Sequence, residues 1–479
     1  MSNFSPETHH DVAVLGAGPA GLAAAGAAAA DGALVALIDS GARPGGQYWR
    51  HRAGDDGAQH GGWSIFQRLR EALARQAANV QYLSGHSIWH VERLSGSGFR
   101  VHTTADGGER VVLARTVIVA TGAYDRQLPF SGWTLPGVFT AGAAQALLKG
   151  QGVLVGSRIV VAGTGPFLLA VAAGLAESGA DVVGVFEAGG TPAGFVRHPL
   201  AVARNPSKLI EGAHYARVLA GHRIPYRTRT AVVAAHGPNS VTGVVVAKLD
   251  RGWEVVPGSQ RTVECDTLAV GYGFTPQLEL AVQLGCATRL DIDGSLVAVV
   301  DDEQLSSVPG VYVAGEATGV GGAALSVVEG EIAGRRAAAA AVKSDPDPKT
   351  LRRLRRRRRA ERGFAAAMHT AFPVQPGWMS WSNEHTVVCR CEEVPKGKIV
   401  DAIVELGAMD PRAVKLYARP GMGLCQGRVC GYATTCIVAA AGGRAPSAAD
   451  LRGVAGQPIA GPVTLGALAA AHERGPGQE

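Results

Sequence analysis

A glycine-rich turn close to the start of the chain joins a short apolar strand to a helix of small residues. The strand is Asp11-Val-Ala-Val-Leu15, the turn is Gly16-Ala-Gly18-Pro-Ala-Gly21, and the alanine-rich run after it predicts a helix to about Asp31. A second apolar strand, residues 34–38, then ends in Asp39. This order of strand, turn, helix and strand is typical of a unit that binds a dinucleotide, and it commits the chain to a parallel α/β sheet.

Each residue of this fingerprint has its own task. Gly16 permits the tight turn, Gly18 lets the backbone approach a pyrophosphate, and Gly21 lets the helix pack closely on the strand. Unpaired N–H groups and the positive end of the helix dipole face the phosphates. Asp39 stands where a carboxylate accepts hydrogen bonds from a ribose. We therefore predict that Gly16, Gly18, Gly21 and Asp39 bind a nucleotide.

The same pattern recurs in the middle of the chain. Residues 158–162 predict a strand that leads into Gly163-Thr-Gly165-Pro-Phe-Leu168, and a second strand, residues 181–186, ends in Glu187. Leu168 replaces the third glycine, so this helix must pack on its strand differently and the nucleotide prediction is weaker. Glu187 would favour NAD over NADP, because a carboxylate repels a 2′-phosphate. Gly163, Gly165 and Glu187 are candidates for NAD or another adenine nucleotide, and a fold that binds none is the alternative.

Two further strand ends complete the pattern, Ala120-Thr121-Gly122 and Gly315-Glu316. Here the sequence resembles the flavin disulfide reductase superfamily, whose members have two dinucleotide-binding domains. The resemblance implies that FAD binds at the first fingerprint, with Thr121, Gly122 and Gly315 beside it. It also places Glu316 where an acid, usually Asp, reaches the flavin ribityl chain and phosphate. The loop containing Gly46 and Gln47 resembles the one that lies beside the flavin ring.

The thiol pair that disulfide reductases of this superfamily carry next to the flavin is missing. Before Cys389 the chain contains only Cys265 and Cys286, which are far apart in the sequence and have no redox-motif spacing. We expect both to be small buried hydrophobic residues. The flavin of this chain must therefore exchange electrons with a different group.

Four cysteines in the last quarter of the chain offer such a group. Cys389 and Cys391 form a C-x-C pair, and Cys425 and Cys430 form a C-x4-C pair after the run Pro420-Gly-Met-Gly423. A helical hairpin predicted between the pairs would bring four thiolates together as a cage for a metal ion or a cluster. Zinc is one candidate, although C-x-C is tight for a zinc knuckle.

The cysteine region resembles the small helical [2Fe–2S] domain of bacterioferritin-associated ferredoxin, which is also fused to several flavoenzymes. The shared features are Cys389-Arg-Cys391-Glu-Glu393 and the stretch from Gly421 to Cys430. The resemblance implies a [2Fe–2S] cluster on Cys389, Cys391, Cys425 and Cys430. Zinc and unbound cysteines remain the alternatives.

Composition and charge limit the fold classes and the binding partners that the chain can have. The 479 residues leave room for several domains, and 47% hydrophobic but only 6% aromatic residues suit tightly packed α/β layers. The net charge of +6 comes largely from the arginine run at residues 352–359, which we interpret as a linker helix rather than a nucleic-acid site. Peripheral contact of this run with a membrane is compatible with its charge. We expect no membrane span, no disulfide framework and a cytoplasmic location.

Nearly the whole chain resembles the A-type subunit of opine oxidases, the large subunit of hydrogen cyanide synthase and the α subunit of dye-linked proline or hydroxyproline dehydrogenases. The shared stretches include residues 120–126, 135–138 and 142–149. The resemblance implies an FAD- and [2Fe–2S]-containing electron-transfer subunit. Its partner would be an amino-acid-oxidase-type flavoprotein that oxidises a C–N bond, often with a small [2Fe–2S] protein as a third member. Electron transfer explains why the sequence shows no catalytic dyad, and we assign none.

Two other functions fit the same residues. The chain could be a self-sufficient NAD(P)H-dependent reductase that feeds its own cluster, or a flavoprotein with a zinc-stabilised interaction domain. The predicted architecture is the same for all three: an α/β protein with two Rossmann-like domains and a small helical C-terminal domain. We expect the FAD domain at residues 1–150 and 291–345, the second nucleotide domain at 151–290, an arginine-rich linker at 346–385, the cysteine domain at 386–445 and a tail at 446–479.

Overall fold

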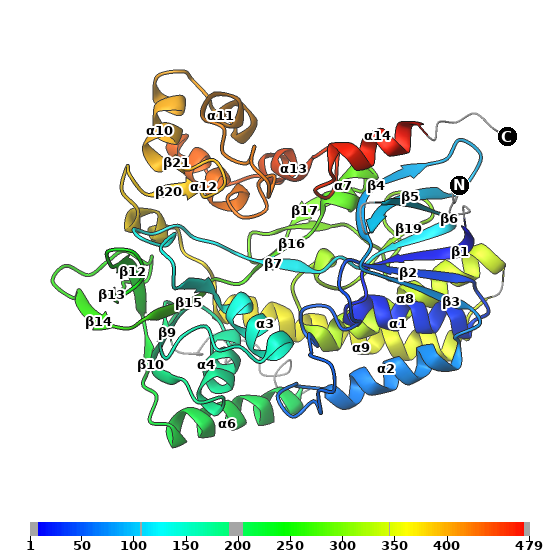
Figure 1. Cartoon of the computed structure of the whole chain (residues 1–479), viewed down its shortest axis with the longest axis horizontal. Helices are drawn as coiled ribbons and strands as arrows, with labels where there is room; N and C mark the ends of the chain where they lie inside the picture. The colour runs from blue at the N-terminus through cyan, green and yellow to red at the C-terminus, as the bar shows by residue number, and fades with distance from the viewer. Residues whose placement is uncertain (1–7, 106–107, 191–204, 344, 474–479) are drawn as a thin grey trace.

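The computed structural model describes residues 8–105, 108–190, 205–343 and 345–473. Two α/β domains lie side by side, and a helical C-terminal module lies across one face of both (Figure 1). The predicted fold class, two Rossmann-like domains and a small helical C-terminal domain, is confirmed.

The first domain is built on a seven-stranded sheet. Its parallel part has the order β3-β2-β1-β6-β19, and β4 and β5 extend β6 as an antiparallel meander. The strands are β1 (Thr8–Leu15), β2 (Val35–Asp39), β3 (Val80–Ser84), β4 (Ser87–Arg93), β5 (Phe99–Ala105), β6 (Gly108–Val119) and β19 (Val311–Val313). Because β1, β2, β6 and β19 run in parallel, their carboxyl ends meet at one edge of the sheet, which is where such sheets bind ligands.

The longer helices of this domain are α1 (Pro19–Ala30), α2 (Trp63–Arg75) and α8 (Ala323–Val342). The alanines of α1 allow α8 to approach its backbone closely. A Cβ atom on Gly330 or Gly334 would lie 2.0 or 2.2 Å from the carbonyl oxygens of Ala20 and Ala24. Glycine at these two positions therefore sets the spacing between the two helices, and larger residues would push them apart.

The second domain has a five-stranded parallel sheet of order β11-β10-β9-β15-β8. These strands are β8 (Val138–Thr140), β9 (Arg158–Gly163), β10 (Asp181–Glu187), β11 (Tyr226–Thr228) and β15 (Thr267–Gly271). The helices are α3 (Ala141–Gln151), α4 (Phe167–Glu177) and α6 (Pro206–Gly221). An antiparallel meander covers the sheet: β12 (Thr230–His236), β13 (Gly243–Lys248) and β14 (Arg261–Glu264).

The chain crosses between the domains on a two-stranded antiparallel ribbon, β7 (Ala123–Asp125) paired with β16 (Phe274–Pro276). After the ribbon the short helix α7 (Glu279–Gln283) and the hairpin β17 (Thr288–Leu290) with β18 (Leu296–Ala298) lead back to β19. The 3-10 helix η2 (Gly315–Thr318) then connects β19 to α8.

The C-terminal module follows the long helix α9 (Pro348–Ala371) and begins with the 3-10 helix η3 (Pro376–Trp381). Its elements are β20 (Val387–Cys389), β21 (Val394–Pro395), α10 (Lys396–Val404), α11 (Pro411–Ala418), α12 (Gly431–Ala441), α13 (Ala448–Ala455) and α14 (Leu465–Glu473). Helix α10 buries Ile399, Ala402 and Ile403. It ends at Val404, and Leu406 beyond its end is 56% exposed.

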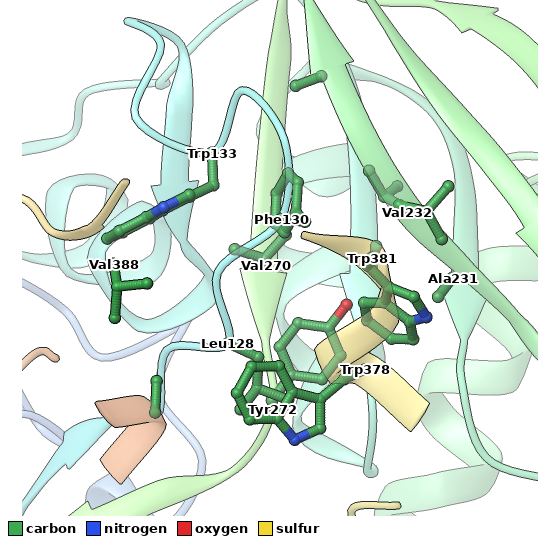
Figure 2. Close-up of a cluster of buried hydrophobic side chains, with 14 of the residues drawn as sticks. Leu128, Phe130, Trp133, Ala231, Val232, Val270, Tyr272, Trp378, Trp381 and Val388 are labelled. Atoms are coloured by element: carbon green, nitrogen blue, oxygen red, sulfur yellow. The ribbon is translucent and has the colours of Figure 1, made fainter. Parts of the chain in front are cut away.

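A cluster of aromatic side chains joins this module to the second domain (Figure 2). The rings of Trp253 and Trp381 stack with centroids 5.9 Å apart, and Trp381 donates its indole N–H to the Trp253 carbonyl at 3.1 Å. Trp133 donates its indole N–H to the Val387 carbonyl at 2.6 Å. Leu451 of α13 packs on the core of the first domain. The module is therefore anchored to both domains rather than suspended from a linker.

The arginine run lies on α9, as the linker-helix interpretation expects, but only part of it is solvated. Arg352, Arg353, Arg356 and Arg357 are exposed. Others form ion pairs with acids of the first domain: Arg355 with Glu303, Arg358 and Arg359 with Asp302, and Arg358 and Arg362 with Glu329. Part of this basic run therefore stabilises the packing of α9 on the first domain.

Candidate functional site

The segments predicted to hold FAD meet at the carboxyl ends of β1, β2, β6 and β19. A Cβ atom on Gly16 would lie 2.5 Å from the Ala120 carbonyl oxygen, directly before Thr121 and Gly122. A Cβ on Gly46 would lie 2.8 Å from the Cα atom of Gly18. One on Gly21 would lie 1.7 Å from the Gly16 carbonyl oxygen, so this glycine does allow close helix–strand packing.

Asp39 is held against the same turn. Its carboxylate accepts from the Ala17 N–H at 2.5 Å and from the Gly41 N–H at 2.6 Å. Burial raises the pKa of Asp39, and these two hydrogen bonds oppose the shift. The N-cap of α1 is Gly18, which supplies no side-chain acceptor, so the first-turn N–H groups have no side-chain cap. That arrangement suits a phosphate.

Gly315 and Glu316 lie beside the first turn of α1. A Cβ on Gly315 would lie 3.0 Å from the Cβ of Ala20. The Glu316 carboxylate accepts from the Gly322 N–H at 2.8 Å, at the start of α8, and from the Gly321 N–H at 3.3 Å. Burial nevertheless raises the pKa of Glu316 to about 7. The side chain of Gln47 is exposed, whereas Gly45 is tied to the turn through its N–H and the Ala17 carbonyl at 2.8 Å.

The second fingerprint is organised around a buried acid. Glu187 has no exposed surface and accepts from the Thr164 hydroxyl at 2.7 Å, the Gly165 N–H at 2.8 Å and the Gly189 N–H at 2.7 Å. Burial raises its pKa. The place of the missing third glycine is taken by Leu168, which packs against Gly271 on the neighbouring strand. Gly163, Gly165 and Glu187 do meet, but the acid is already engaged within the protein.

Each cysteine pair lies shortly before a helix, the first before α10 and the second before α12. Cys389 ends β20, Cys391 follows in the turn to β21, and Cys430 directly precedes α12. The Gly421 N–H donates to the Cys389 sulfur at 3.4 Å. A Cβ on Gly423 would lie 2.3 Å from the Cβ of Cys391. The glycine run therefore lets the two cysteine loops approach each other.

Hydrogen bonds among the four thiols divide them into donors and acceptors. The Cys430 thiol donates to Cys389 and Cys425, which lowers the pKa of Cys389 to about 6 and that of Cys425 to about 4. The same two bonds raise the pKa of Cys430. Cys391 donates to Cys425 and is the most exposed of the four. These contacts are pairwise: among the described residues no group of three or more His, Cys, Asp or Glu side chains is placed to hold a metal ion.

The loop between Cys425 and Cys430 touches the first domain, which the sequence did not predict. Arg428 forms an ion pair with Glu279 at 2.8 Å, and the Tyr124 hydroxyl is hydrogen-bonded to the Arg428 side chain. Nearby, the guanidinium of Arg126 lies over the Tyr432 ring, 4.5 Å from its centroid, and pairs with Asp293 at 2.8 Å. A cavity opens at this junction between the module and the first domain. The partners are far apart in the sequence, so no local pattern marks them.

Comparisons with known proteins agree with this architecture. Residues 10–340 match the family model of pyridine nucleotide-disulphide oxidoreductases. The chain belongs to this family. Residues 387–440 of the oxidoreductase match the model of a BFD-like [2Fe-2S] binding domain.

Two relatives of this oxidoreductase cover almost its entire length. The A-type opine oxidase subunit of Agrobacterium tumefaciens is 32% identical, over 90% of this chain and 86% of its own. Hydrogen cyanide synthase subunit HcnB of Pseudomonas aeruginosa is 34% identical, over 88% of this chain and 90% of its own. The crystal structure of L-proline dehydrogenase from P. horikoshii superimposes on this chain with a TM-score of 0.68 at 20% sequence identity. The match covers 96% of this chain and 80% of the dehydrogenase chain, which shows a shared fold. The resemblance to the opine oxidase and hydrogen cyanide synthase subunits is thereby confirmed.

The protein is thus an oxidoreductase of this family, with FAD and a [2Fe–2S] cluster as its cofactors. The residues present fit both groups. At the turn before α1, the N–H groups of the helix have no side-chain cap and the glycines carry no side chain. The backbone of this turn can therefore contact a pyrophosphate directly. In the module, glycines let the two cysteine loops approach each other, and the Gly421 N–H donates to the Cys389 sulfur as a donor to a cluster thiolate would. Among the described residues, no helix is long and apolar enough to cross a membrane.

Proposed function

We propose that this chain is the electron-transfer subunit of a hetero-oligomeric dehydrogenase or oxidase that acts on the C–N bond of an amino acid, an imino acid such as proline or hydroxyproline, or an opine. The observation that carries the proposal is the junction at Arg428. The second cysteine loop packs on the crossing ribbon and on the start of α7, next to the FAD domain. The seven cysteines are free, and Cys265 and Cys286 are buried in different cores.

We assign FAD to the first fingerprint. Gly16, Gly18 and Gly21 would shape the turn for the pyrophosphate, Asp39 would accept the ribose hydroxyls, and Glu316 would reach the ribityl chain. Five further residues would line the site: Gly46, Gln47, Thr121, Gly122 and Gly315. The support for this assignment is that their backbone segments converge on one edge of the sheet.

Cys389, Cys391, Cys425 and Cys430 would hold the cluster. When bound, a flavin accepts two electrons and releases them singly to a one-electron acceptor such as a [2Fe–2S] centre. The protein's own contribution is binding, spacing and electrostatics. The Gly421 N–H donates to the Cys389 sulfur, and such donors stabilise thiolate charge. The buried Trp253–Trp381 contact holds the module in a fixed place.

The substrate class and the partner rest on the relatives. Both are named as subunits, one of an opine oxidase and one of a hydrogen cyanide synthase, so we propose that a second flavoprotein of the amino-acid-oxidase type performs the dehydrogenation. A small [2Fe–2S] protein is a further candidate partner. Free cysteines and an iron–sulfur site suit a reducing compartment, and we propose a cytoplasmic location.

Purification with and without its partner tests this function. The full chain is produced alone and together with the products of neighbouring reading frames, and dye reduction by proline, hydroxyproline and opines is measured for each preparation. We expect activity only in the co-purified complex. A lone chain with full activity would contradict the proposal.

The other two functions give different signals in the same preparations. Rapid bleaching of the flavin by NADH in the isolated chain would favour a self-sufficient reductase. We expect none, because the Glu187 carboxylate is buried and already accepts three hydrogen bonds. Zinc in place of iron and sulfide would favour the interaction-domain function. Chemical analysis for iron, sulfide and zinc, read with the visible spectrum, decides between them.

A further inference from the structure

The side chain of Arg428 lies at the centre of the contact between the cysteine module and the FAD domain. Its Nε atom is 2.8 Å from the Glu279 carboxylate, and the two side chains are only 11% and 13% exposed. One terminal nitrogen donates to the Cys425 carbonyl at 3.1 Å, and the other donates to the Ala460 carbonyl. Arg428 therefore connects the backbone of a cysteine ligand to an acid of another domain.

Both partners of Arg428 in the FAD domain are tied to the predicted flavin turn. Tyr124 follows two residues after Gly122 on the crossing ribbon. Glu279 begins α7, two residues after Gln277, whose N–H donates to the Gly122 carbonyl at 2.9 Å. The Thr121 hydroxyl donates to the Gln277 carbonyl at 2.8 Å. Hydrogen bonds thus join the turn at Thr121 and Gly122 to Gln277, the backbone leads from Gln277 to Glu279, and Arg428 connects Glu279 to the carbonyl of Cys425.

We propose that the Arg428–Glu279 ion pair is a positioning element that fixes the cluster loop against the flavin site and sets the reduction potential of the cluster. This inference rests on the proposed function. The step concerned moves one electron: one ferric ion of the cluster becomes ferrous as the two-electron-reduced flavin loses one electron. The pair contributes the distance between the two sites and the electric field at the acceptor.

The opposite charges of Arg428 and Glu279 predict that removing one residue or the other shifts the reduction potential of the cluster in opposite directions. A guanidinium stays charged at any pH that the protein tolerates, and it stabilises the extra negative charge of a reduced cluster. Glu279 compensates that charge in the native protein. Loss of the acid therefore leaves an unopposed cation next to Cys425 and raises the potential, whereas loss of the arginine lowers it. With Arg428 bound to the Cys425 carbonyl at 3.1 Å in a partly buried site, each charge of the pair is expected to shift the reduced-to-oxidised ratio on the order of tenfold, about 59 mV for one electron.

Redox titration of the full-length protein, followed by the electron paramagnetic resonance signal of the reduced cluster, tests the charge effect. We expect a higher potential in Glu279→Gln, a lower one in Arg428→Gln, and a value close to wild type in the double variant. Arg444→Gln removes an ion pair with Asp450 on the same module and is the matched control, with no expected shift. Equal potentials in all variants, or shifts of the same sign in both single variants, would overturn the proposal.

Arg428→Lys separates position from charge. Lysine keeps the positive charge but cannot reach the Glu279, Cys425 and Ala460 oxygens together, because it lacks the planar fork of arginine. We expect a potential close to wild type and slower cluster reduction after the flavin is reduced by light, measured by stopped-flow absorbance. A wild-type rate in Arg428→Lys would refute the positioning role.

These measurements do not depend on a substrate or a partner. A protein that contains no iron–sulfur cluster would refute the proposed function itself, and this is visible in the iron and sulfide content before any titration. A protein that contains the cluster but shows no shift refutes only the role of the ion pair.

Discussion

Arg362 of α9 donates to the Glu329 carboxylate of α8 at 2.8 Å, and the Glu329 side chain has no exposed surface. Arg358 donates to the same oxygen at 3.1 Å. The other oxygen accepts from the Gly315 N–H at 3.1 Å and from the Thr318 hydroxyl at 2.8 Å. A single buried carboxylate therefore joins the arginine helix to the turn next to Glu316.

Removal of Arg362 should destabilise the first domain. Arg362→Ala leaves a buried carboxylate with one cation fewer, and breaking a buried ion pair costs about 3 kcal/mol. Urea denaturation followed by flavin fluorescence measures the loss. Arg352→Ala is the control, because Arg352 is exposed on the same helix and its removal should change stability by less than about 0.5 kcal/mol. Equal small losses in both variants would show that the arginine run is only a solvated surface.

Gly423→Ala should impair cluster assembly and leave flavin binding intact. The new Cβ would lie 2.3 Å from the Cβ of Cys391, a distance that no packing tolerates, so the two cysteine loops must separate. Iron and sulfide per flavin should fall well below the wild-type ratio. Gly442→Ala in the same module adds a Cβ at ordinary contact distances of 3.5 Å or more and should retain the cluster. Full cluster content in Gly423→Ala would contradict the observed approach of the loops.

Glu316 should make the flavin-free protein less stable as the pH rises. Burial raises its pKa from 4.5 to about 7, so between these values the native protein holds a proton that the unfolded chain has released. The free energy of unfolding therefore falls with rising pH in that window, by up to about 1.4 kcal/mol per pH unit. Glu316→Gln removes this contribution, so the variant should lose less stability between about pH 5 and about pH 7.5. Identical pH dependence in variant and wild type, measured by urea denaturation of the flavin-free forms, would count against the buried carboxyl.

Trp381→Ala should loosen the C-terminal module. The substitution removes a buried ring stacked on Trp253 together with its hydrogen bond, and such a truncation costs about 3–5 kcal/mol. Limited proteolysis should then cleave the linker region sooner and release the module, with loss of iron from the flavin-containing fragment. Leu416→Ala, at a side chain that is 73% exposed, should be cleaved at the wild-type rate. The prediction fails if both variants resist proteolysis equally.

The nucleotide-binding turn and the cysteine loops could be predicted from the sequence because the residues that form each of them are close together in the chain. The turn at Gly16 and the acid at Asp39 belong to one continuous stretch, and the spacing of glycines within it allows few other structures. The cysteine loops are local in the same sense, since Gly423 and Cys425 lie within one short run. The matches to the two family models fall on these stretches.

Long-range contacts could not be predicted in this way. Arg428 looks like a spacer between two cysteines, and nothing near it in the sequence indicates Glu279. The sequence predicts a charged surface for the arginines of α9, because the acid that pairs with two of them, Glu329, lies on another helix. Glu187 fits a ribose-binding pattern by position, and only its burial shows that its carboxylate is already engaged. Each of these depends on the packing of segments that are distant in the sequence.

The module lies across both α/β domains, fixed to one by the Trp253–Trp381 stack and to the other by Arg428 and Leu451. Because the module is attached to both domains, it opposes their rotation about the ribbon of β7 and β16 that joins them. We therefore expect the spacing between the first fingerprint and the cysteine loops to vary little. Control over turnover is then expected to act where electrons enter or leave the chain rather than between the two sites.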